Sequence, residues 1–292
     1  MSTHAPPSAM TLLSHPYREL VPVNGGAQQL REQGRSPGSA LVWHLERGVH
    51  AQDANVVRGR PGGLPVIVVL PRVADLGSDT GLLADIDAVR PLAVLPYHPV
   101  PYLEDLTSVL RKPPQDLGRE VTDYLAWRGL PVDRETAHLI RRTVALSADL
   151  RSVSALCRSM YLSRRALGRR FLSRGLPVPS HWLHVARLIR VAIRLQNSDE
   201  SVLSVGYELG YPDAFSLSNQ MARLTGHRPS EVRRYLGWEW LLEAWLRREA
   251  DSGGLAPDFT MHVLRTEPRP KRAAYGVRAV AEHAADTDRA TG

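Results

Sequence analysis

The chain has 292 residues, and its 37 Lys and Arg residues outnumber its 30 Asp and Glu residues, giving a formal net charge of +7. This length suits one large or two modest domains, each with room for a core. No apolar run approaches the roughly 18–20 residues of a bilayer span, and no secretory signal is visible at the start. Cys157 is the only cysteine, which excludes an internal disulfide and a cysteine-clustered zinc site. We therefore expect a reduced, cytoplasmic setting and no membrane partner.

The first part of the chain changes character near residue 39. Residues 1–38 combine Pro, Gly, Ser and Gln with little periodicity, which predicts a disordered leader. Residues 39–112 hold three short apolar runs bounded by Gly or Pro, and we expect each to be a buried strand: 40–45, 65–70 and 92–95. Helical spacing of apolar residues predicts helices at 79–89 and 102–110. This order indicates a small α/β domain with parallel strands.

The sequence indicates the fold of the α/β domain more clearly than its role. Residues 64–110 loosely resemble the second half of a response-regulator receiver domain, in a degenerate form without an acidic pocket for phosphorylation. A catalytic site needs convergent polar groups at strand ends, and the strand ends here offer mainly Pro71, Arg72, Pro96, Tyr97 and His98. His44, His50 and His98 lack the close spacing of a metal site. We interpret 39–112 as a regulatory or dimerisation module, with an enzyme built on it as the alternative, and we expect no cofactor or metal.

Helical patterns dominate the rest of the chain. The predicted fold class is mainly α, with an all-α double helix-turn-helix domain following the small α/β domain. The predicted segments are a helical linker at 113–133, the double helix-turn-helix domain at 134–235, an amphipathic helix at 237–250 and a disordered tail at 251–292.

The first helix-turn-helix unit is predicted between Val153 and Phe171. Val153, Leu156 and Cys157 line one face of a short helix, and Leu167 and Phe171 continue that apolar face in the next helix. Ser163 can cap the second helix, because a serine hydroxyl accepts a backbone N–H that would otherwise lack a partner. The outward face of this second helix carries several arginines and no acid, which suits a helix lying in a major groove.

A second unit repeats this arrangement in residues 201–225. Gly210 is suited to the left-handed conformation that closes a helix, and Asp213 can cap the next one. Between the two units, residues 180–196 form an apolar-striped helix of about 25 Å. A rod of that length could hold two reading helices about one duplex turn apart, roughly 34 Å.

These residues resemble the DNA-binding domain of the AraC/XylS family of bacterial transcription regulators over residues 134–235. In the first unit the matching residues are Leu162-Ser163, Arg165-Ala166-Leu167 and Arg169-Arg170-Phe171. In the helix between the units they are Trp182-Leu183, Arg187-Leu188, Ala192 and Leu195. In the second unit they are Gly210-Tyr211, Asp213, Leu217-Ser218, Gly226, Pro229-Ser230 and Arg233. The resemblance leaves about two-thirds of the chain uncovered.

The resemblance implies which side chains face DNA. In the first unit these are Arg165, Gly168 and Arg169, beside the outward Arg164. In the second unit they are Ala214, Phe215, Ser216, Ser218 and Asn219, with Arg223 also outward. Several depart from common family choices: Gly168 has no side chain to read with, Ala214 and Phe215 offer only apolar contact, and Gly206 stands where the family usually has alanine. We therefore expect Arg165 and Arg169 to provide most of the direct specificity.

The position of the charges supports a DNA-facing surface. Residues 133–236 contain seventeen arginines and eight acidic residues, a net charge of +9, which leaves the remainder of the chain near −2. Phosphate neutralisation by such a segment predicts salt-sensitive binding. We predict a transcription regulator, not an enzyme, with double-stranded DNA as partner and an effector that the sequence leaves open. RNA polymerase would be a further partner of an activator, and a homodimer is one use of the α/β domain. The alternative interpretation of the same basic segment is a non-specific or architectural nucleic-acid binder.

Overall fold

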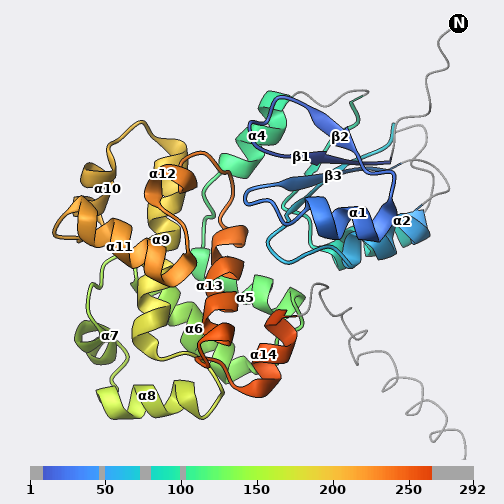
Figure 1. Cartoon of the computed structure of the whole chain (residues 1–292). Helices are drawn as coiled ribbons and strands as arrows, with labels where there is room; N and C mark the ends of the chain where they lie inside the picture. The colour runs from blue at the N-terminus through green and yellow to red at the C-terminus, as the bar shows by residue number, and fades with distance from the viewer. Residues whose placement is uncertain (1–8, 46–49, 73–79, 99–102, 265–292) are drawn as a thin grey trace, which may run out of the picture.

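The computed structural model describes residues 9–45, 50–72, 80–98 and 103–264, which form a sheet half and a helical half (Figure 1). The sheet half consists of β1 (Met10–Leu13), β2 (Leu20–Pro22), α1 (Gly26–Gln33), β3 (Ala40–His44), α2 (His50–Arg58), β4 (Val66–Val69), α3 (Thr80–Val89), β5 (Ala93–Leu95) and α4 (Leu103–Arg111). The helical half consists of α5 (Leu117–Trp127), α6 (Arg134–Leu146), α7 (Val153–Ser159), α8 (Arg164–Leu172), α9 (Pro179–Asn197), α10 (Val202–Glu208), α11 (Ala214–Thr225), α12 (Pro229–Val232), α13 (Glu239–Asp251) and α14 (Pro257–Leu264). In this described part of the chain, none of the helices has the length and apolar character needed to cross a membrane.

The sheet is mixed and has the strand order β2-β1-β3-β4-β5. The three strands expected from the apolar runs, β3, β4 and β5, pair in parallel as predicted. Helices cover both faces: α1, α2 and α3 pack on one, whereas Leu106 and Leu110 of α4 pack on the other together with Leu236. Burial on both faces explains why the central strands are nearly continuous apolar runs in the sequence.

The strand directions limit the likeness to a receiver domain. A doubly wound sheet with the order 2-1-3-4-5 is parallel throughout. Here β1 runs antiparallel to both of its neighbours and forms a hairpin with β2. The likeness therefore extends to three parallel strands and the helices between them. The interpretation of this half as a degenerate receiver domain does not fit the sheet as a whole.

The prediction of a disordered leader over residues 1–38 is wrong for the part that the structure describes. Strands β1 and β2 and helix α1 lie within it, and Leu12 and Leu13 of β1 are buried on opposite faces of the sheet. The run Met10–Leu13 has only four residues, and its partner β3 lies about thirty residues later. Periodicity within the segment carries no sign of that pairing. The sheet half therefore begins earlier than the predicted boundary at residue 39.

Two further segments of the helical half differ from their predictions. The segment 113–133 is helical as expected, but α5 packs along α6 and buries Tyr124 and Leu125 in the core, so it is part of the helical half rather than a linker. The predicted disordered tail contains α14, whose Phe259 and Val263 are buried in the same core. The rest of that tail, from residue 265, lies outside the described residues.

A buried polar cluster joins the two halves at α13. The Tyr124 hydroxyl donates to Oε1 of Glu243 at 2.5 Å and accepts from the backbone N–H of Gly63 at 2.7 Å. The Nε of Arg128 donates to the same carboxylate oxygen at 2.6 Å. A Cβ on Gly63 would lie 2.9 Å from Cα of Trp240, so only glycine permits this approach of the sheet half to α13.

Candidate nucleic-acid interface

The first helix-turn-helix unit consists of α7, a short turn and α8. Its core is formed by the residues predicted from the apolar spacing, and Leu156, Cys157, Leu167 and Phe171 are all buried. The Ser163 hydroxyl accepts from the backbone N–H of Ala166 at 3.1 Å, which confirms it as the N-cap of α8. This cap starts α8 immediately after the turn, so the helix leaves the core at a fixed angle with its opposite face free.

The second unit has the same construction in α10 and α11. The carboxylate of Asp213 accepts from the backbone N–H of Ser216 at 2.6 Å and caps α11, and this hydrogen bond lowers the pKa of that carboxyl group. Gly210 has φ +78° at the end of α10, the left-handed conformation that glycine adopts most easily. Leu217 and Met221 are fully buried in the helical core, where α11 packs against α10 and α13. Both caps and the turn agree with the predictions.

Helix α9 holds the two units. It is the longest described helix, Pro179–Asn197, and Trp182, Leu188 and Leu195 are among its buried side chains. Figure 1 shows α7 and α8 beside one end of α9 and α10 and α11 beside the other, on the side of the helical half that faces away from the sheet. A shared, buried rod fixes the spacing and orientation of the two units.

The predicted site residues of the first unit lie mostly on the open face of α8. The side chains of Arg164, Arg165 and Arg169 are exposed. Arg164 donates to the hydroxyl of Ser154 on α7, so it is partly engaged within the unit. A Cβ added to Gly168 would meet nothing within 4 Å, which places this glycine on the same open surface. Arg165 and Arg169 are therefore both free to contact a ligand.

The predicted site residues of the second unit are less uniform. Phe215 is 74% exposed and Asn219 is also exposed, whereas Ala214 is half-buried. The hydroxyl of Ser216 donates to Oδ2 of Asp213 at 3.0 Å, and that of Ser218 donates to the carbonyl of Ala214 at 2.8 Å. Each serine keeps lone pairs for accepting a hydrogen bond, but its hydroxyl proton is already used. Phe215 and Asn219 thus present the most available surface of α11.

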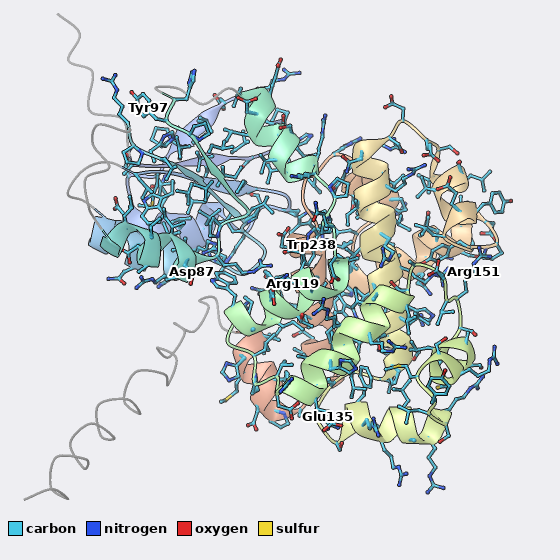
Figure 2. All side chains as sticks on the ribbon, turned by 180° about the vertical axis from the view of Figure 1, so that it is seen from behind. Asp87, Tyr97, Arg119, Glu135, Arg151 and Trp238 are labelled. Carbon is cyan, nitrogen blue, oxygen red and sulfur yellow. The ribbon has the colours of Figure 1, made fainter. Side chains whose placement is uncertain are left out.

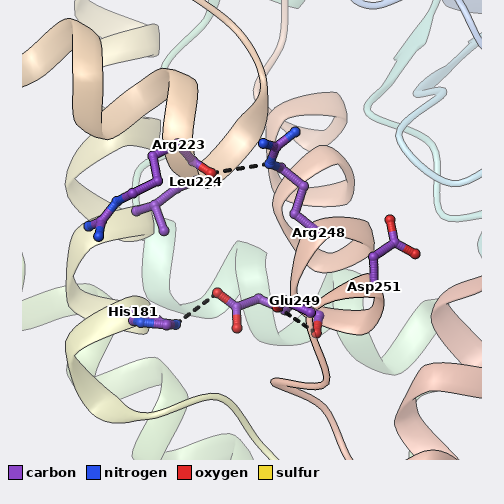
Figure 3. Close-up of a pocket in the computed structure, with 7 residues that line it drawn as sticks. His181, Arg223, Leu224, Arg248, Glu249 and Asp251 are labelled. Carbon is purple, nitrogen blue, oxygen red and sulfur yellow. Dashed lines mark hydrogen bonds and ion pairs between the residues drawn. The ribbon is translucent and has the colours of Figure 1, made fainter.

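The last predicted residue, Arg223, lies near the opposite end of α11 beside a pocket of about 480 Å³ between α9, α11 and α13 (Figure 3). The Nε of Arg248 donates to the carbonyl of Arg223 at 3.1 Å. Across the pocket, Nδ1 of His181 lies 2.9 Å from Oε1 of Glu249, which also accepts from Nε1 of Trp245 at 2.9 Å. The Arg248 hydrogen bond attaches the C-terminal end of α11 to α13, and the His181–Glu249 contact attaches α9 to α13. The exposed guanidinium of Arg223 lies outside both contacts.

The arginine excess of residues 133–236 does not all face outward. Many of these arginines bind other parts of the protein. Arg187 donates to the carbonyl of Leu209, Arg190 to that of Val144 and Arg233 to that of Ser198, whereas Arg194 pairs with Glu200 and Arg174 with Glu135. Carbonyls at helix ends lack partners within their own helix, and long arginine side chains satisfy them. The net charge of +9 therefore overstates the charge available to DNA, which corrects the sequence interpretation.

The other candidate chemistry of the sequence is not brought together. Burial lowers the pKa of the His44 imidazole at the end of β3. His98 follows β5, and the side chain of His50 lies outside the described residues. In the described parts of the chain, no group of three or more His, Cys, Asp or Glu side chains is placed to hold a metal ion. Cys157 is buried in the core of the first unit, as its position on the apolar face predicted.

Two helix-turn-helix units attached to one shared helix have the architecture expected of a DNA-binding domain. Residues 156–235 match the family model described as a helix-turn-helix domain, so this segment is an AraC-type helix-turn-helix domain and the resemblance seen in the sequence is confirmed. The chain is also similar to the raffinose operon transcriptional regulatory protein RafR of Pediococcus pentosaceus, with 33% identity over 86 residues. The similarity covers 30% of this chain and 31% of that relative, so the chain spans about a third of the relative's length. No solved structure matches the chain.

The two units meet where the connection before α7 contacts the turn of the second unit, and we call this boundary the seam. It carries an exposed arginine, Arg151, which was not among the predicted site residues. Its side chain lies against the backbone of Gly210, which is 59 residues away in the sequence. The sequence contains no local signal for this contact, because it depends on how α9 places the second unit beside the first.

Proposed function

We propose that this chain is a transcription regulator that binds duplex DNA sequence-specifically, with α8 and α11 entering two adjacent segments of the major groove. The observation that supports it most is the pair of capped helix-turn-helix units attached to opposite ends of α9. The nineteen residues of α9 correspond to roughly 28 Å, close to the roughly 34 Å that separates successive major-groove segments on one face of a duplex.

The exposed side chains support a division of roles between the two helices. Arg165 and Arg169 can each donate two parallel hydrogen bonds to a guanine edge or contact phosphate oxygens. Asn219 can pair with an adenine edge, and Phe215 can pack on a thymine methyl group. The remaining predicted residues, Arg164, Gly168, Ala214, Ser216, Ser218 and Arg223, would line the edges of the same two surfaces.

The rest of the chain enters the proposal as a regulatory or dimerisation module. We place the DNA-binding domain at residues 134–235 and assign the sheet half, which includes the predicted domain at 39–112, to effector response or to a homodimer contact. RNA polymerase is a partner if the regulator activates. The cytoplasm, where bacterial DNA lies, is the setting that follows. The transcription role also agrees with the name of the similar relative.

Selection from a randomised duplex pool, followed by a salt titration on the recovered sequences, tests this function. We expect discrete motifs with two conserved blocks about one helical turn apart, and an affinity that falls steeply with salt. No affinity for any duplex at low salt would overturn the proposal. Equal affinity for all sequences would instead favour the alternative, an architectural binder.

A further inference from the structure

The seam between the two helix-turn-helix units carries an exposed arginine. Arg151 lies in the connection between α6 and α7, directly before Ser152, the N-cap of α7. Figure 2 shows Arg151 at the outer edge of the helical half, between the second unit and the α7 segment. A Cβ built on Gly210 would overlap the Cδ and Nε atoms of Arg151, so the arginine stem rests on the bare backbone of the second unit's turn.

A second arginine holds the other side of the same turn. Arg187 of α9 is only 5% exposed, and its guanidinium donates to the carbonyl of Leu209 and lies 4.5 Å from the centre of the Tyr211 ring. The turn of the second unit is therefore held between a buried guanidinium and an exposed one.

The two guanidinium groups are close enough to influence each other. Burial is the main cause that lowers the pKa of Arg187; Tyr211 opposes this shift, and the positive charge of Arg151 adds to it. Within the described residues, neither arginine forms an ion pair with a carboxylate. Two like charges without a counter-charge favour an anion at the exposed one.

We propose that the Arg151 guanidinium binds a backbone phosphate of the DNA at the point where the duplex passes from one recognition helix to the other. This inference rests on the proposed function, because it places the duplex across both α8 and α11. The strand between two adjacent major-groove segments must then pass the seam where Arg151 is exposed. The planar guanidinium can donate two hydrogen bonds to one phosphate.

This contact would fix position rather than read sequence. Phosphate contacts set the register of a protein on the duplex without carrying base information. Because the stem of Arg151 is held on Gly210, the phosphate would be bound at a fixed distance from both units. Arg151 is thus a positioning residue for the pair of recognition helices.

The test compares Arg151→Gln, Arg151→Lys and wild type in the full chain, on a selected operator and on a random duplex. Arg119→Gln is the matched control: it removes the same charge from α5, where Arg119 is exposed and pairs with Asp123 at 3.5 Å. Arg119 lies well away from Arg151 in Figure 2. Thermal unfolding of each variant would check that the exposed substitutions leave the fold intact.

We expect Arg151→Gln to weaken binding to both duplexes by the same factor, roughly tenfold. The slope of log affinity against log salt concentration should fall in magnitude by about one. Arg151→Lys should retain most of the slope, and Arg119→Gln should change neither quantity. Unchanged binding by Arg151→Gln, a loss confined to the selected operator, or a loss equal to that of Arg119→Gln would each overturn the phosphate contact while leaving the proposed function intact. A wild-type chain that binds no duplex would instead overturn both.

Discussion

The two helix-turn-helix units share one construction but present different surfaces. In both, a side-chain oxygen caps the second helix, and a buried leucine one turn later, Leu167 or Leu217, fixes that helix to the core. The outward face of α8 is dominated by arginine, whereas that of α11 presents Phe215 and Asn219. A common scaffold thus carries a cationic face in the first unit and a nearly neutral one in the second.

The second unit is supported from behind by α13 and, through it, by the sheet half. The end of α11 is tied to α13 by Arg248, and His227, just after α11, meets the Trp240 ring of α13 edge-on at 5.1 Å. Trp240 in turn packs on Tyr235 at 5.5 Å, which contacts His15 of the sheet half at 5.8 Å. The second unit is therefore in continuous contact with the sheet half through aromatic rings. We therefore expect the placement of the second unit to depend on α13 and on the sheet half.

The largest effect is expected from truncating the matched core leucines. Leu167→Ala and Leu217→Ala should each cost about 2–5 kcal/mol of unfolding free energy, because both side chains are fully buried and leave a cavity. Urea unfolding followed by fluorescence measures the loss. Similar values would support equivalent scaffolds, and a much smaller loss at Leu217 would show that the second unit is loosely packed.

The cationic face of α8 should contribute more DNA affinity than the surface of α11. Arg169→Ala is expected to weaken a selected operator by about 1–3 kcal/mol if Arg169 reads a base, with a smaller loss for Asn219→Ala. Fluorescence anisotropy at several salt concentrations measures both. Equal losses on specific and random duplexes would reassign Arg169 to a phosphate, and a larger loss at Asn219 would contradict the division between the units.

Phe215 offers a test of the apolar surface of α11. Because its ring is 74% exposed, Phe215→Ala should leave the unfolding free energy within about 0.5 kcal/mol of wild type. Affinity should fall only for operators with thymine at the contacted position, because the ring would pack on the thymine methyl group. Replacing that thymine by uracil in the wild-type complex should reproduce the loss, and an affinity that ignores this change would exclude the contact.

Local signals in the sequence were enough for both units and for three strands of the sheet. Capping residues such as Ser163 and Asp213 bind a backbone N–H only three residues away, so the local sequence predicts them. The strands β3 and β4 are buried on both faces, so each is a continuous apolar run that can be recognised by itself. β1 and α14 were missed because each depends on partners elsewhere: β1 on β3, and α14 on α13.

The candidate site shows the same limit. The exposed faces of α8 and α11 follow from helical periodicity, so Arg165, Arg169, Phe215 and Asn219 could be predicted as outward. Periodicity could not distinguish the arginines that bind carbonyls of other helices, such as Arg187 and Arg190, from those available to DNA. Nor could it find Arg151, whose position at the seam follows from the packing of both units on α9.

One glycine in each unit gives a smaller, paired test. Gly168→Ala and Gly206→Ala should each stabilise the protein by about 0.5–1 kcal/mol, since alanine favours the helix and neither position is blocked. A Cβ on Gly168 meets nothing within 4 Å, and one on Gly206 would lie 3.4 Å from Leu217 Cδ2, an ordinary contact. Thermal unfolding measures the gain. DNA affinity should change only for Gly168→Ala, whose methyl group stands on the outward face, and a change at the buried Gly206 would contradict this assignment.

The smallest expected effect is a pH dependence that concerns the second unit. Burial lowers the pKa of His184 on α9 to about 4, assisted by the charges of Arg187, His181 and Arg223, and burial also lowers that of His227 despite the nearby Glu231. The folded state therefore keeps these imidazoles neutral, whereas the unfolded chain takes up protons near the ordinary value of 6.5. The unfolding free energy should be highest above pH 6.5 and should fall as the pH approaches 4, with part of the effect screened by solvent.

Urea unfolding across this pH range measures the decline. It should be shallower for His184→Gln than for wild type, whereas a variant of the exposed His138 on α6, His138→Gln, should follow wild type. A decline that persists unchanged in His184→Gln and in the corresponding His227 variant would show that acid sensitivity arises outside the second unit.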